Sequence, residues 1–447
     1  AYVTGLSEGD SVMVAMADNL TGRVKHEMAL KRPPRVSVSM NGTQAAEGFE
    51  VPYGGLIYIT LSANGETEKE VDFYGAVQLA PLFKMTSATK GHWVTHPEQS
   101  NAPLTEIVAN RFVYTTTTAA IKGHSDDDVL EMAKQLDLFT ISANEFYGRD
   151  STQGMHAMFT DSSMPYVNMR MVDDAQISIG AAHSGYPVMV DRFPTENSGL
   201  INASTDWLVG HEIGHNLATN WFNVPGAGET ANNLLALYNQ DRNMGDMPRI
   251  KTTITQASVY AKDDVNPWAN GSNADRLNFF GQLKIWAEDN FSIAEWESVE
   301  RLSLPRSIYN KTAMESYDEG WNFIKLVHRK AREGELNADN STNYCSSEIK
   351  KKHSLTQEGM LMVCSSYLTK VDLSSFFNQW NVGESKQTIA FEDNYFGGVV
   401  DDKNAQDLIA TMRENKLFTR VPQGQPIDIN QVPVDGEKLM PQQPYWN

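Results

Sequence analysis

The chain has 447 residues, which is long enough for two or three domains and at least one large hydrophobic core. Its hydrophobic share of 41% and charged share of 21% are ordinary for a globular protein. The net charge of -19 argues against binding to nucleic acid or to anionic membrane surfaces. No run of 18 apolar residues occurs, so we expect no membrane span. The start at Ala1, without a signal-like segment, suits a mature or shortened chain.

The first 95 residues have the pattern of short β-strands. Polar and apolar residues alternate in Ser11–Ala15, Arg35–Met40 and Val71–Gly75, while Gly54–Thr60 is a short apolar run after glycines. Turn residues separate these stretches. The spacing predicts an antiparallel N-terminal β-sandwich module over residues 1–95. Such a module would serve for packing, and a glycan-binding role is the alternative.

Residues 96–390 mix strands with helices and form the expected catalytic domain. We expect a helix over Asp126–Leu138 and strands over Val172–Ile179 and Pro187–Val190. The second half of this domain is mainly helical, with broad aromatic faces of the kind that usually form a core. Residues 391–447 are rich in Gly and Pro and predict a small C-terminal β or extended segment. The expected fold class is therefore α+β and multidomain, with a mixed sheet and a large helical part.

The segment HEIGH at residues 211–215 carries the strongest chemical signal. If it is helical, His211 and His215 lie one turn apart on the same face, where both imidazoles can bind one metal ion. Glu212 then projects beside the metal and can take a proton from water there. Good N-cap residues at Ser204–Asp206 support the helix. The alternative is a buried helix with two hydrogen-bonded histidines, and we take the interpretation in which zinc is the cofactor.

A catalytic zinc ion usually has three protein ligands. The pattern HExxHxxGxxH, which supplies a third histidine, is excluded because Ala218 and Trp221 stand at its glycine and histidine positions. The gluzincin arrangement takes a glutamate from the next helix, which we expect over Glu229–Tyr238 with Glu229 in its first turn. An acidic residue favoured by the helix dipole is the alternative explanation of Glu229. Asp241 is the second candidate ligand.

The two cysteines, Cys345 and Cys364, lie close in sequence at the ends of a polar loop. We expect them to form a local disulfide in an exported protein. Two buried free thiols are the alternative. A cysteine-zinc site would need more such residues.

Four stretches occur together in the order found in one family: Gly54–Ile59, His183–Pro187, His211–Asn216 followed by Gly228 and Glu229, and Asp372–Trp380. They resemble the enhancin-like, mucin-degrading zinc metallopeptidases, which are metallopeptidase family sixty. The resemblance spans nearly the whole chain apart from the C-terminal segment. Within the family, the chain is similar to secreted bacterial colonisation factors.

The resemblance implies a gluzincin ligand set of His211, His215 and Glu229, with Glu212 as the general base. It also implies a secreted or cell-surface peptidase that cleaves O-glycosylated proteins such as mucins, with the glycan as part of what is recognised. One departure concerns Ala218, because family members often have glutamine three residues after the second motif histidine.

His183 and Tyr186 lie in a loop between two expected strands ahead of the motif. Such strands commonly form the upper rim of a zinc-protease cleft, where substrate can add as an extra strand. Both residues could therefore contact substrate. A loop histidine and a packing tyrosine would explain them equally well.

The expected reaction is zinc-assisted hydrolysis of a peptide bond, in which Glu212 takes the proton of the attacking water and returns it to the leaving amine. Tyr186, His183 and Tyr260 are candidate donors to the oxyanion. Asp206 or another acidic residue could hold the outer nitrogen of a ligand histidine. Two other functions stay open. One is a glycoprotein-binding adhesin with structural zinc, and the other is a general gluzincin peptidase without a glycan requirement.

Overall fold

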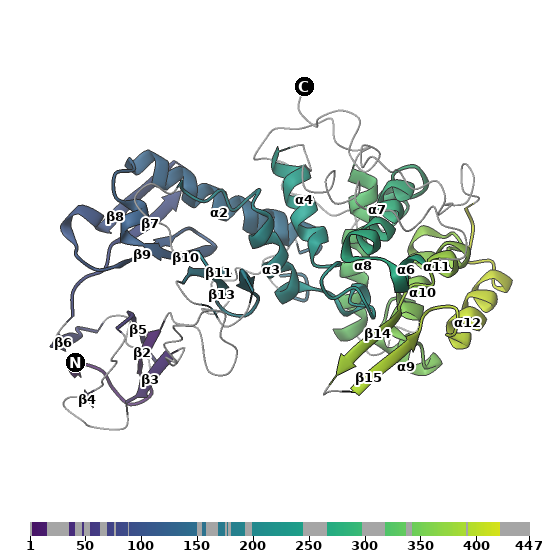
Figure 1. Ribbon diagram of the computed structural model, residues 1–447, viewed down its shortest axis with the longest axis horizontal. Coiled ribbons are helices and arrows are strands. Elements are labelled where there is room, and N and C mark those ends of the chain that lie inside the picture. The colour runs from purple at the N-terminus through teal and green to yellow at the C-terminus, as the bar shows by residue number, and fades with distance from the viewer. Residues whose placement is uncertain are drawn as a thin grey trace. The chain divides into compact units, whose positions relative to one another are not determined.

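The computed structural model divides into two units, which Figure 1 traces from the N-terminal strands to the C-terminal helices. Unit 1 comprises residues 1–137 and 168–202, and unit 2 comprises residues 138–167 and 203–447. The structure describes residues 2–15, 35–40, 47–48, 54–62, 69–75, 77–87, 89–149, 154–157, 169–174, 177, 180–192, 199–244, 266–296, 318–336, 342–389 and 392–420.

The N-terminal strands form two three-stranded antiparallel sheets that share one core. The first sheet has the order β4-β1-β6 and the second β3-β2-β5. Their bounds are β1 Tyr2–Thr4, β2 Ser11–Ala15, β3 Arg35–Ser39, β4 Glu47–Gly48, β5 Leu56–Thr60 and β6 Asp72–Tyr74. Val3 of β1 packs in one buried cluster with Val12 and Val14 of β2 and with Met40. Because alternate residues of β2 point into this cluster, the alternation in the sequence is that of a sandwich strand. The predicted N-terminal β-sandwich is confirmed.

A mixed seven-stranded sheet follows, with the order β12-β13-β11-β10-β9-β7-β8. Strand β10 pairs in parallel with β11, β11 with β13 and β7 with β9, and the other neighbours are antiparallel. The bounds are β7 Leu82–Ser87, β8 Lys90–Thr95, β9 Leu104–Val108, β10 Phe112–Thr117, β11 Met169–Asp173, β12 Ala182–His183 and β13 Val188–Val190. The mixed sheet is confirmed. Strands β7 and β8 pair with this sheet although they precede residue 96, where we expected the catalytic domain to begin.

Side chains tie the sandwich to the seven-stranded sheet within unit 1. Tyr58 of β5 donates its hydroxyl to Glu106 of β9. Arg170 of β11 lies over the Tyr58 ring, 4.5 Å from its centroid, and pairs with Glu106 at 2.7 Å. A charge-assisted hydrogen bond and a cation–π contact thus meet at one tyrosine.

Unit 2 is mainly helical. Its helices are α3 Trp207–Leu217, α4 Asn233–Met244, α6 Pro267–Asn270, α7 Asn273–Asn290, α8 Asp318–Leu336, α9 Ser347–His353, α10 Gln357–Thr369, α11 Ser374–Trp380 and α12 Lys403–Glu414. A capping box between Ser272 and Asp275 begins α7. The Phe279 ring of α7 stacks on Phe376 of α11 at 5.0 Å and meets Trp380 edge-on at 5.8 Å. The aromatic faces of the sequence are therefore core, as expected.

Helix α2 spans Asp126–Phe146 and is longer than the predicted Asp126–Leu138. Its residues are divided between the two units, with the division after Asp137. The extra turns continue the apolar pattern, since Phe139, Ala143 and Phe146 are all buried.

The C-terminal part differs from the expected β or extended segment in containing a helix after its strands. Strands β14 (Glu384–Ile389) and β15 (Glu392–Gly397) form an antiparallel hairpin that begins before residue 391. Helix α12 then follows, capped by Asp402 and burying Ala405, Leu408, Ile409 and Met412. The sequence interpretation missed this amphipathic helix because it relied on Gly and Pro residues that flank Lys403–Glu414 and do not occur within it. The rest of the segment, residues 421–447, lies outside the described residues.

The predicted disulfide between Cys345 and Cys364 is confirmed. It joins the turn before α9 to helix α10. The indole of Trp221, shortly after α3, donates to the carbonyl oxygen of Cys345 at 2.7 Å. None of the helices that the structure describes is long and apolar enough to cross a membrane.

Candidate metal centre

Helix α3 contains the HEIGH segment. Its N-cap is Asp206, whose Oδ1 accepts a hydrogen bond from the backbone N–H of Val209 at 3.0 Å. An N-cap carboxylate accepts a hydrogen bond from an otherwise unpaired backbone N–H group. Its negative charge also interacts favourably with the positive end of the helix dipole. The helix ends at Leu217, so both histidines of the segment lie within it. The expected helix is confirmed, and Asp206 caps it.

Two glycines allow α3 and α4 to approach closely. A Cβ atom at Gly214 would lie 2.3 Å from the carbonyl oxygen of Asn232, and one at Gly210 would lie 2.7 Å from Cα of Ala236. Atoms in packed protein interiors do not come so close, so only glycine permits this contact. The segment before α4 is thereby brought against the turns of α3 that carry the histidines.

Glu229 lies in a run of turns rather than in a helix. We expected its helix to begin at Glu229, but α4 begins at Asn233. The N–H groups of Thr230 and Ala231 both donate to the carbonyl oxygen of Ala227 at 2.9 Å, which closes tight turns around Glu229. The expected helix start is wrong by four residues. The difference arises because the N–H groups of Thr230, Asn233 and Leu234 each bond to the carbonyl oxygen three residues back instead of four.

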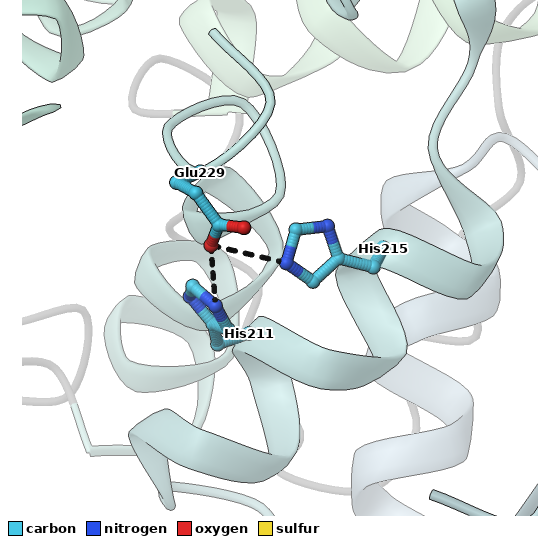
Figure 2. Close-up of side chains that lie close together, drawn as sticks. All are labelled: His211, His215 and Glu229. Carbon is cyan, nitrogen blue, oxygen red and sulfur yellow. Dashed lines mark ion pairs between the residues drawn. The ribbon is translucent and has the colours of Figure 1, made fainter. Parts of the chain in front are cut away.

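Three side chains of this region converge, as Figure 2 shows. His211 Nε2 is 3.2 Å from Glu229 Oε2, and His215 Nε2 is 3.3 Å from the same oxygen. One ligand atom from each residue lies within 4.8 Å of those of the other two. The imidazole rings are 4.8 Å apart and nearly perpendicular. All three atoms thus point toward one small volume.

Asn233 determines the tautomer of His211. Its Nδ2 donates to the carbonyl oxygen of Glu229 at 2.9 Å, which identifies Oδ1 as the oxygen that faces His211 Nδ1 at 2.6 Å. An amide oxygen can only accept, so Nδ1 of His211 carries the proton. His211 therefore presents the lone pair of Nε2 toward Glu229 and His215. This arrangement is typical of a metal-ligating histidine, whose outer N–H is held by an acceptor.

Asn232 is a second amide in the centre. Its Nδ2 donates to the backbone oxygen of His211 at 3.1 Å and lies 3.0 Å from His215 Nε2. A donor at this position indicates that His215 Nε2 is unprotonated, and a metal ion would take the same lone pair in place of this hydrogen bond. Sequence reasoning missed Asn232 and Asn233 because it searched for acidic partners of the histidines. The sequence signal that could have identified them is the pair of amide residues three and four positions after Glu229. The turns at this point bring both residues against α3.

Glu212 lies inside α3 and is 5% exposed. A buried carboxylate next to a histidine that could bind a metal is suited to proton transfer, because little bulk water competes for it. Asp241, the second candidate ligand, does not join the histidines. It is buried in α4 and accepts a hydrogen bond from the indole of Trp321 at 2.7 Å.

The other candidates lie elsewhere. His183 and Tyr186 belong to unit 1, where the His183 Nδ1 lies 2.7 Å from the carbonyl oxygen of Ser184 and Tyr186 is 57% exposed. Burial of its hydroxyl raises the pKa of Tyr186 above its usual value. Their role toward substrate stays a prediction. Tyr260 lies outside the described residues.

The donor set of the centre fits zinc. Two imidazole nitrogens and one carboxylate oxygen are the ligands of a catalytic zinc site, which keeps a fourth position open. His211, His215 and Glu229 are the group of this kind among the residues that the structure describes. The Glu229 side chain is 62% exposed, so solvent reaches the centre from its side.

The fold is similar to those of two solved metallopeptidases. The structure matches the IMPa metallopeptidase from Pseudomonas aeruginosa with a TM-score of 0.57 over 92% of this chain and 47% of that one. It matches the ZmpB metallopeptidase from Clostridium perfringens with a TM-score of 0.56 over 91% of this chain and 73% of that one. The sequence identities are 17% and 14%, so these likenesses concern the fold.

A family model described as peptidase M60, enhancin and enhancin-like matches residues 75–381. A second model, the N-terminal domain of M60-like peptidases, matches residues 3–73. The chain belongs to the M60, enhancin-like peptidase family.

Curated relatives agree with this membership. The AcfD homolog of Escherichia coli strain K12 is 41% identical over 94% of this chain, and the accessory colonization factor AcfD of Vibrio cholerae is 38% identical over 96%. The resemblance to bacterial colonisation factors is thereby confirmed. The chain spans 27% of the length of each of these two relatives.

Proposed function

We propose that the protein is a zinc-dependent endopeptidase that cleaves peptide bonds in O-glycosylated proteins such as mucins. The observation that carries the proposal is the convergence of His211, His215 and Glu229 on one point, with the Nε2 lone pair of His211 directed inward. A zinc ion held there would polarise the scissile carbonyl and make a water molecule more acidic. Membership of a peptidase family supports peptide hydrolysis as the reaction.

The residues of the proposed centre have separate roles in this reaction. His211, His215 and Glu229 hold the metal, and Asn233 keeps His211 in the tautomer that can bind it. Glu212 takes the proton from the attacking water and passes it to the leaving amine. We further propose that His183 and Tyr186 contact substrate, which the 57% exposure of Tyr186 supports. Residues 1–95, 96–390 and 391–447 are proposed as N-terminal module, catalytic domain and C-terminal segment.

The glycan requirement rests on proteins of similar fold. IMPa from Pseudomonas aeruginosa has been solved in complex with an O-glycopeptide. A substrate with attached sugars can supply binding energy remote from the scissile bond, which favours cleavage of glycosylated chains over bare ones. We propose a secreted or cell-surface location, which the naming of a relative as a colonization factor supports.

The test compares digestion of intact mucin and enzymatically deglycosylated mucin by the wild type and Glu212→Gln, with zinc content measured in both proteins. Cleavage of intact mucin alone, lost in a variant that retains zinc, is the expected result. Glu414→Gln is the matched control, since Glu414 is exposed on α12 and should behave as wild type. Full hydrolysis by Glu212→Gln would contradict the proposed role of Glu212 as general base.

Two other outcomes would replace the proposal. Equal cleavage of both substrates would make the protein a general peptidase without a glycan requirement. Zinc binding without cleavage of either substrate would instead indicate a glycoprotein-binding module with a structural metal.

A further inference from the structure

The metal centre brings hydrogen-bond acceptors close together. Nδ1 of His211 carries the proton, so Nε2 of the same ring presents a lone pair. Oε2 of the Glu229 carboxylate lies 3.2 Å from this nitrogen and 3.3 Å from Nε2 of His215. Acceptor atoms at such distances repel one another, because each carries negative charge. The group is therefore favourable only with a hydrogen-bond donor or a cation against it.

Asn232 supplies such a donor. Its Nδ2 lies 3.0 Å from Nε2 of His215 and donates to the backbone oxygen of His211 at 3.1 Å. A carbonyl oxygen can only accept, so it identifies the atom that faces both residues as the amide nitrogen rather than the amide oxygen. The two hydrogens of this nitrogen have one acceptor each. One of these acceptors is the lone pair of His215 that a metal would use.

Asn232 lies where bulk water does not reach it. The residue is 2% exposed, and its Oδ1 has no hydrogen-bond partner among the described residues. Its backbone is held against α3, since a Cβ atom at Gly214 would lie 2.3 Å from the carbonyl oxygen of Asn232. Metal binding at His215 would take the acceptor of a buried N–H group and place a cation near its positive end. Both effects cost free energy, so the metal and Asn232 compete for one lone pair.

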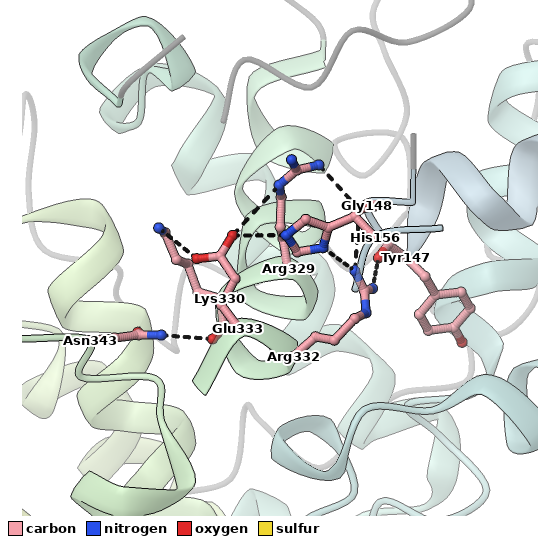
Figure 3. Close-up of polar contacts among 8 residues, drawn as sticks. All are labelled: Tyr147, Gly148, His156, Arg329, Lys330, Arg332, Glu333 and Asn343. Carbon is pink, nitrogen blue, oxygen red and sulfur yellow. Dashed lines mark hydrogen bonds and ion pairs between the residues drawn. The ribbon is translucent and has the colours of Figure 1, made fainter. Parts of the chain in front are cut away.

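His156, another histidine of unit 2, has partners that are harder to displace, as Figure 3 shows. Its Nδ1 accepts a hydrogen bond from Arg332 at 2.8 Å, and its Nε2 lies 3.0 Å from Glu333. Hydrogen bonds to charged groups are about twice as strong as those between neutral groups. The partner of His215 is a neutral amide instead. This weaker kind of bond can be exchanged for a metal.

We propose that Asn232 tunes metal binding, because its amide holds the lone pair of His215 that zinc would take and must release it when zinc binds. The proposal rests on the proposed zinc site and adds a residue outside the ligand set. Asn232 acts through His215, so it is a positioning residue and not a catalytic one. It directs Nε2 of His215 toward Glu229 before the metal arrives, and it lowers the affinity for the metal.

The competition should outweigh the positioning. The His215 ring also packs against the His211 ring, 4.8 Å away, so its orientation does not depend on Asn232 alone. The bond from Asn232 to the backbone oxygen of His211 can persist with and without metal, and it then cancels from the affinity. One neutral hydrogen bond remains, which corresponds to about two- to tenfold in affinity. Removal of the amide should therefore tighten zinc binding.

The first test measures zinc affinity of the full 447-residue chain by competition with a chromogenic chelator. Asn232→Leu replaces the amide by an apolar group of similar shape and should bind zinc about two- to tenfold more tightly than the wild type. Asn233→Leu is the matched control, because the same substitution one residue later removes an acceptor from His211 and should weaken binding. Asn404→Leu, at an exposed position of α12, should leave the affinity unchanged.

Urea unfolding gives a second readout that does not depend on zinc. Without zinc, Asn232→Leu should be less stable than the wild type, since His211 and His215 both lose a donor. The same zinc concentration should then stabilise the variant more than the wild type, because the variant binds zinc more tightly. Asn232→Ala also removes the amide and should change in the same directions, so it decides the matter if Asn232→Leu does not fold.

Two outcomes would overturn the proposal in different ways. If the wild type binds zinc and the folded Asn232 variants bind it equally well or more weakly, Asn232 does not compete with the metal and the proposed zinc site stands. If the wild type binds no zinc, the proposed function fails together with this inference.

Discussion

His211 and Asn233 are joined by a hydrogen bond of 2.6 Å between Nδ1 and Oδ1. The outer partner of this proposed zinc ligand is an amide, where a carboxylate is a frequent choice. An amide fixes the tautomer but adds no charge. With Glu229 as the anionic member of the ligand group, a bound zinc ion would keep a net positive charge to act on a carbonyl.

Replacement of Asn233 should weaken zinc binding. In Asn233→Leu the Nδ1 proton of His211 loses its acceptor, and the carbonyl oxygen of Glu229 loses a donor. Loss of such a partner typically costs about 10–100-fold in metal affinity. Competition with a chromogenic chelator measures the effect. Asn233→Asp keeps an acceptor and adds a negative charge, so it should bind zinc at least as tightly as the wild type. Equal affinities in the wild type and Asn233→Leu would contradict the role of Asn233.

Zinc affinity should fall at acid pH. Protons compete with the metal for Nε2 of His211 and His215, since only an unprotonated imidazole nitrogen binds zinc. The zinc affinity should therefore decrease as the pH falls. The same chelator competition, repeated across pH, tests this expectation. A constant affinity down to about pH 5 would exclude the two histidines as ligands.

Gly214→Ala should destabilise the protein. Its Cβ would lie 2.3 Å from the carbonyl oxygen of Asn232, so α3 and the segment before α4 must separate. Overpacking of this kind costs about 1–3 kcal/mol and outweighs the gain of about 1 kcal/mol from alanine in a helix. Urea unfolding of the metal-free protein measures the difference, and zinc affinity should fall as well. Gly199→Ala is the control, since nothing lies within 4 Å of a Cβ there. A Gly214→Ala variant as stable as wild type would show that the contact adjusts freely.

His328 should make the protein sensitive to acid. Burial first, and then the charges of Arg332 and Arg149, lower its pKa in the folded state. The unfolded chain therefore binds the proton more readily, and stability is lost as pH falls below the unfolded value of about 6.5. The loss amounts to about 1.4 kcal/mol per pH unit while the folded His328 stays neutral. His328→Leu should reduce this slope between about pH 7 and pH 5, whereas His92→Leu, at an exposed strand position, should not. Parallel pH profiles for wild type and His328→Leu would refute the assignment.

The parts of the fold that follow from local periodicity were predictable. Alternation in Ser11–Ala15 indicates a half-buried strand, and the structure buries Val12 and Val14. The spacing of His211 and His215 has chemical meaning only on a helix, and α3 is that helix. Each of these inferences depends only on residues that are close together in the sequence.

The parts that depend on packing between segments were not predictable. Glu229 precedes α4 because tight turns, closed on Ala227, precede the helix. Asn232 and Asn233 acquire their roles because Gly210 and Gly214 let the two helices meet, which no periodicity shows. Sequence patterns identify which residues carry chemistry. Tertiary contacts decide which neighbours hold those residues in place.

Trp221 occupies the place at which another class of zinc peptidase has its third histidine. Here its indole is buried and donates to the carbonyl oxygen of Cys345, whose sulfur is bonded to Cys364. A position that elsewhere serves as a metal ligand is thus used as an anchor to a covalent cross-link. The cross-link persists only in an oxidising environment. Reduction of the disulfide should therefore loosen the anchor of the segment that follows α3.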